Sequence, residues 1–147
     1  MLPVSPIKMR VLCSSSKAKI KTFASALGEA FFTQAQSVPP AYPCEKERLV
    51  LLVISLNGAP NDQLRRFCSE LTSARAYNVA LVVDNKEQQQ GIQAVKDILT
   101  QAGTNVLDDI YYLKSPGFFS GSKISLEERT AIVRWAQKII DSIKTNK

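Results

Sequence analysis

The residues best suited to chemistry are three consecutive serines followed by two lysines, between an apolar segment (9–13) and an amphipathic one that starts near residue 18. A helix N-terminus carries free N–H groups and the positive end of the helix dipole, both of which attract phosphate. The serine hydroxyls would add donors and the lysines positive charge. The predicted anion-binding residues here are Ser14, Ser15, Ser16, Lys17, Ala18 and Lys19. The alternative is that the serines cap the helix and the lysines are solvated.

Positive charge is concentrated in the same part of the chain. Lys and Arg number 19 against 13 Asp and Glu, a net charge of +6, and residues 1–28 hold five basic residues and no acidic one. A basic excess confined to one end of the chain calls for a local explanation. The lysines occupy one loop and are not interleaved with aromatic residues, so nucleic acid is not the expected partner.

The composition excludes several kinds of site. The absence of histidine removes Ser-His-Asp and Cys-His catalysis and His-ligated metals, and we predict neither catalytic nor metal-ligating residues. No GxxxxGK[ST] or GxGxxG motif occurs, which disfavours a kinase or a dinucleotide-dependent dehydrogenase.

Several features favour a cytoplasmic protein. The three cysteines, at positions 13, 44 and 68, are far apart, as is typical of reduced thiols. The longest apolar run, 49–54, is too short to cross a membrane, and the N-terminus lacks the roughly 7–15-residue apolar stretch of a signal peptide. We therefore expect a cytoplasmic location and no membrane partner.

Apolar segments alternate with amphipathic ones along the chain. The expected strands are 8–13, a short edge strand within 35–38, 49–54, 78–83, and one within 106–113 centred on 110–113. The expected helices cover about 20–31, 62–71, 92–102 and 125–143, with Asn61 or Asp62 capping the second and Ser125 and Glu128 forming a capping box at the last. Trp135, Ile139 and Ile143 are expected to pack inward from the last helix.

This alternation predicts an α/β fold, a three-layer α/β/α sandwich around a five-stranded parallel sheet of order 2-1-3-4-5. The chain of 147 residues suits one domain, which we place at 8–147 after an N-terminal extension, 1–7. Ligands of such sheets bind beyond the carboxyl ends of the strands. Segments 14–20, 55–62 and 84–90 are therefore expected to converge, which adds Asn57, Gly58, Asp84 and Asn85 to the site.

From Lys8 onward the chain resembles the flavodoxin family in the order and spacing of its elements. The resemblance rests on segments 9–16 (MRVLCSSS), 49–55 (LVLLVIS) and 78–83 (NVALVV), and on the final amphipathic helix with Trp135. It implies FMN as cofactor, with its phosphate at the first loop and its ring toward the other two. The implied function is electron transfer with a redox partner protein, as a carrier or a small FMN-dependent reductase in which the isoalloxazine does the chemistry.

The loops also depart from the family pattern. The first lacks the glycine that lets the backbone approach the phosphate, and no aromatic residue occurs in 55–64 or 84–93. The alternative function is therefore a flavodoxin-like interaction or anion-binding module that no longer binds flavin.

Overall fold

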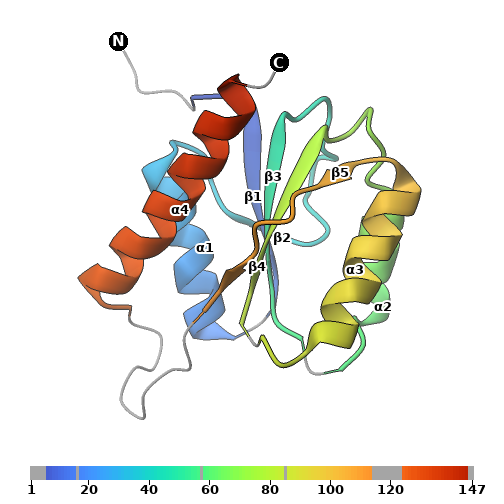
Figure 1. The fold of residues 1–147 in the computed structure, drawn as a ribbon, viewed down its shortest axis with the longest axis horizontal. Coiled ribbons are helices and arrows are strands. Elements are labelled where there is room, and N and C mark those ends of the chain that lie inside the picture. Colours follow the sequence, from blue (N-terminus) through green and yellow to red (C-terminus); the bar gives the residue numbers. More distant parts are fainter. Residues whose placement is uncertain (1–5, 16, 57, 85, 114–123, 146–147) are drawn as a thin grey trace.

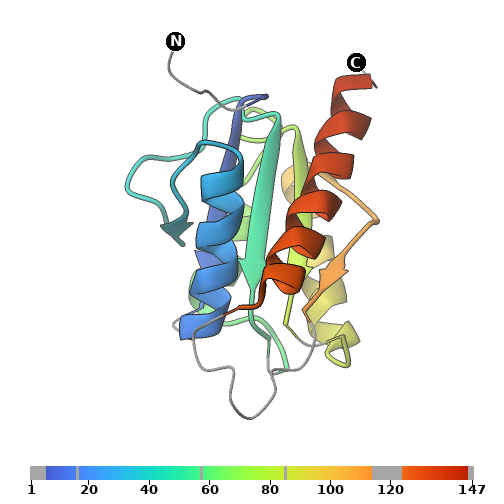
Figure 2. The same cartoon turned by 90° about the vertical axis from the view of Figure 1, so that its left-hand side faces the viewer.

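The computed structural model describes residues 6–15, 17–56, 58–84, 86–113 and 124–145, which form a parallel sheet between two layers of helices (Figures 1 and 2). The strands are β1 (Met9–Ser14), β2 (Gln36–Ser37), β3 (Leu49–Ile54), β4 (Asn78–Val83), β5 (Asn105–Val106) and β6 (Tyr111–Tyr112). The helices are α1 (Ala18–Ala30), α2 (Asp62–Ser69), α3 (Gln89–Ala102) and α4 (Leu126–Thr145). No described helix is both long enough and apolar enough to cross a membrane.

The order of the strands confirms the predicted topology. The sheet runs β2-β1-β3-β4-β5, β6 also pairs with β4, and all these pairings are parallel. β1 and β3 are aligned along their full length, from Met9 beside Leu49 to Ser14 beside Ile54. Every residue of β3 is buried, as expected of a central strand covered on both faces.

The fifth position of the sheet differs from the prediction because two short strands share it. Val79 pairs with Val106 and Val82 pairs with Tyr111. Between these two pairs β4 advances by three residues, whereas the neighbouring segment advances by five. The two extra residues form a bulge that separates β5 from β6. Asp109 lies exposed in this interruption and accepts a hydrogen bond from the indole Nε1 of Trp135 at 3.0 Å.

The helices cover the sheet in pairs. α1 and α4 pack on one face, and α2 and α3 on the other (Figure 1). Ile139 and Ile143 are buried in the core between the sheet and the α1–α4 layer, as predicted. Trp135 is only half-buried at the margin of that core, where its ring centroid lies 5.5 Å from that of Tyr111.

Local sequence signals correctly placed two helix starts. The Asn61 side chain accepts from Leu64 N at 2.8 Å and caps α2. At α4, Ser125 Oγ accepts from Glu128 N and Glu128 Oε1 accepts from Ser125 N, both at 3.0 Å, which is the predicted capping box. The proline-rich connection from β2 to β3 contains no helix, since proline is disfavoured in helix interiors.

Candidate anion-binding site

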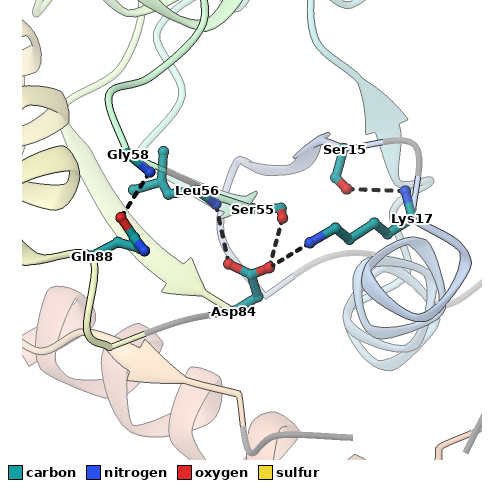
Figure 3. Close-up of polar contacts among 7 residues, drawn as sticks. All are labelled: Ser15, Lys17, Ser55, Leu56, Gly58, Asp84 and Gln88. Atoms are coloured by element: carbon teal, nitrogen blue, oxygen red, sulfur yellow. Dashed lines mark hydrogen bonds and ion pairs between the residues drawn. The ribbon is translucent and has the colours of Figure 1, made fainter.

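The turn from β1 into α1 lies at the carboxyl edge of the sheet and is short. β1 ends at Ser14 and α1 begins at Ala18, after Lys17 in extended conformation. Ser15 Oγ accepts from Lys17 N at 3.0 Å, which stabilises the turn (Figure 3). Among the described residues, no side chain caps α1 and its first turn holds no acidic residue, so the helix start stays electropositive. Ser16 lies outside the described residues.

The two lysines predicted to attract the anion each face a carboxylate. Lys17 Nζ lies 3.3 Å from Asp84 Oδ2, and the Lys17 side chain is 64% exposed. Lys19 Nζ lies 3.5 Å from Glu128 Oε2, and its side chain is only 12% exposed. Their positive charge is therefore partly balanced inside the protein, and their role in anion binding stays a prediction.

Asp84 connects the ends of the two central strands. Its carboxylate accepts from Ser55 Oγ at 2.6 Å and from Leu56 N at 3.1 Å, in addition to the contact with Lys17 (Figure 3). The Asp84 side chain is only 15% exposed, and its contacts with Ser55 and Leu56 are part-buried, whereas its contact with Lys17 is exposed. The predicted site residue Asp84 thus holds the loop after β3 against the end of β4.

A second set of contacts joins the same loops further from the sheet. Gly58 N donates to Gln88 Oε1 at 2.7 Å (Figure 3). A Cβ atom at Gly91 would lie 2.2 Å from the carbonyl oxygen of Gly58, so the loop after β3 rests directly on the first turn of α3. Asn57 and Asn85 lie outside the described residues.

A cavity of about 340 Å³ opens beside the predicted first loop. It spans the carboxyl ends of β1 and β2 and the start of α2, and its lining residues are Cys13, Ser14, Ser15, Lys21, Ser37, Val38, Asn61 and Gln63. The described lining offers hydroxyls, amides and one ammonium group, and it contains no carboxylate. This chemistry suits a small anion.

Several of these residues were missed from sequence. Lys21 lies one helical turn after Lys17, a spacing that places both on one side of α1 and could have signalled it. Ser37 ends the edge strand, and Asn61 falls inside the converging segment 55–62 but was assigned only the role of a cap. Ser55 and Gln88, which hold the loops, fall inside the segments expected to converge.

Cys13 lines the cavity as a buried thiol. It is buried, and this burial raises its pKa above the ordinary value, although a weak contact to the Ser15 carbonyl and the charge of Lys21 act in the opposite direction. A protonated thiol is a poor nucleophile. Among the described residues, no cluster of three or more potential metal ligands occurs.

A larger cavity, about 440 Å³, lies at the opposite, amino-terminal edge of the sheet. Its only charged lining residue in the described part of the chain is Arg48, which donates to the Ile143 carbonyl at 3.1 Å in the last turns of α4. Arg48 thus stabilises the C-terminal end of α4, where a positive charge interacts favourably with the helix dipole. Parallel α/β sheets bind ligands at their carboxyl edge, so the candidate site is the smaller cavity there.

The fold is flavodoxin-like. A search of solved structures finds the flavodoxin of Streptococcus pneumoniae TIGR4, with a TM-score of 0.59 and 8% sequence identity, covering 91% of this chain and 98% of that one. No family model matches the sequence. No curated protein matches it either.

The cofactor that the resemblance implies fits this site only in part. The hydroxyl-lined cavity offers donors suited to the phosphate of FMN. The loops after β3 and β4 do not fit a ring between them. The residues on either side of position 57, Leu56 and Gly58, donate backbone hydrogen bonds to Asp84 and Gln88 of the opposite loop.

Proposed function

We propose that this chain is a flavodoxin-like module that binds a phosphate-bearing small molecule at the carboxyl edge of its sheet. The cavity beside β1 and β2 would hold the phosphate, with Lys21 supplying charge and Ser14, Ser15 and Ser37 supplying hydroxyl donors. The three cysteines are free and buried, which supports a reducing cytoplasmic location.

One observation carries this proposal. The cavity combines an ammonium group with several hydroxyls and has no carboxylate in its described lining. It also lies beside the start of α1, where the N-cap residue Lys17 makes no side-chain capping hydrogen bond and the first turn holds no acidic residue. A negatively charged ligand would therefore meet donors from three elements and no repulsion from the lining.

FMN-dependent electron transfer with a redox partner is the second candidate. The overall likeness to a flavodoxin favours it. The contacts that join Asp84 and Gln88 to the loop after β3 count against a ring placed between the two loops.

Calorimetric titration with inorganic phosphate tests the proposal. Lys21→Glu should weaken binding about tenfold, equivalent to about 1.4 kcal/mol. Lys138→Glu makes the same change in net charge on α4, away from the lining residues, and should leave affinity unchanged. The effect of Lys21→Glu should shrink as salt is raised, because exposed charges are screened over about 8–10 Å. If both variants weakened phosphate binding equally, the effect would come from net charge alone, and the proposed site would be refuted.

A further inference from the structure

We propose that the loops after β3 and β4 are latched together, and that this latch prevents a flat aromatic ring from lying between the two loops. The site would then bind a ligand through its phosphate alone. The latch consists of Ser55, Leu56, Gly58, Asp84 and Gln88 (Figure 3). That the ligand carries a phosphate rests on the proposed function. That a ring is excluded rests on the latch alone.

The first argument is that both neighbours of position 57 are held from the opposite loop. Leu56 N donates to Asp84 Oδ1 at 3.1 Å, and Gly58 N donates to Gln88 Oε1 at 2.7 Å. A ring inserted between the loops would have to break both hydrogen bonds. It would leave the Leu56 N–H, which lies in a part-buried contact, without its acceptor.

The second argument is that the loop after β3 packs closely on the first turn of α3 at Gly58. The Gly58 carbonyl oxygen would lie only 2.2 Å from a Cβ atom at Gly91, and the Leu56 side chain would lie 3.4 Å from it. These distances describe direct backbone packing that only a glycine at position 91 permits. A planar group would have to displace this loop as a body.

The third argument is chemical. Segments 55–64 and 84–93 contain no Trp, Tyr or Phe to stack on a ring. Lys17 reaches across the same edge to Asp84, so the polar groups there already satisfy one another. The site gains little from a ring and loses several internal contacts.

Ligand comparison tests the ring exclusion. Inorganic phosphate, FMN and riboflavin are titrated against the full chain by calorimetry, and the fluorescence of FMN and riboflavin is recorded alongside. We expect the Kd of FMN to lie within about tenfold of the Kd of phosphate, and the flavin fluorescence to stay unquenched. Riboflavin, which lacks the phosphate, should not bind. FMN bound more than tenfold tighter than phosphate, with quenched fluorescence, would overturn the inference.

Amide hydrogen exchange tests the latch independently of any ligand. The Leu56 and Gly58 amides should exchange slowly in the wild-type protein. Asp84→Ala should accelerate the first and Gln88→Ala the second, whereas Gln90→Ala, an exposed neighbour on α3, should change neither. Fast exchange at both amides in the folded wild-type chain would overturn the latch. Slow exchange without phosphate binding would instead refute the proposed function and leave the latch standing.

Discussion

Replacing Asp84 with alanine should destabilise the fold substantially. The change removes the acceptor of Ser55 Oγ and of Leu56 N, both in part-buried contacts. Hydrogen bonds to a charged group contribute about 1.5–3 kcal/mol each, and the effects of neighbours are not additive. The ion pair with Lys17, which is 64% exposed, adds only about 0–1 kcal/mol. We expect a loss of about 2–4 kcal/mol in the free energy of unfolding.

Urea unfolding followed by circular dichroism measures this loss, and thermal unfolding should show a Tm lower by roughly 5–15 °C for a chain of this size. Asp84→Asn should cost less, because its amide oxygen can still accept from Leu56 N. Lys17→Met, which removes only the ion pair, should cost under about 1 kcal/mol. A wild-type midpoint for Asp84→Ala, or an equal loss in Lys17→Met, would refute the assignment of Asp84 as the residue that holds the loops.

Three further changes probe neighbouring parts of the molecule. Ser125→Ala should lower the free energy of unfolding by about 1 kcal/mol in urea titrations, and an unchanged midpoint would show that the cap is dispensable. The backbone N–H of Ser125 holds the pKa of Glu128 below its usual 4.5, so this residue's contribution to stability is present above that pH and is lost as pH falls through the lowered pKa. Glu128→Gln should therefore make stability decline less steeply in acid, and identical acid profiles would contradict this. Gly91→Ala should cost about 1–3 kcal/mol through overpacking against the loop, and a neutral effect in thermal unfolding would argue against the close contact.

The sheet could be predicted from sequence because its central strands are continuous apolar runs. β3 is buried throughout, and its pattern needs no knowledge of distant residues. The local sequence does not predict that the fifth position of the sheet is divided between β5 and β6. It depends on register against β4 and accompanies a hydrogen bond from Trp135 to Asp109, 26 residues apart. The same bond accompanies the half-buried position of Trp135, which apolar periodicity alone placed in the core.

The convergence of the loops at the candidate site could be predicted from topology, but the side-chain partners there could not. Convergence of the three carboxyl-edge loops follows from strand order. The partner of Lys17 is 67 residues away along the chain, and the partner of Lys19 lies on α4. No local pattern reports such pairs. Charge counting therefore indicated a basic loop without revealing that Lys21 is the lysine that lines the cavity.

Mapping of inorganic phosphate by ¹H–¹⁵N NMR titration tests the central claim most directly. The account predicts saturable shifts clustered at Ser14, Ser15, Lys21, Ser37 and the start of α2, and their loss in Lys21→Glu. Shifts confined to the amino-terminal edge of the sheet, or no saturable shift in the wild-type protein, would contradict it.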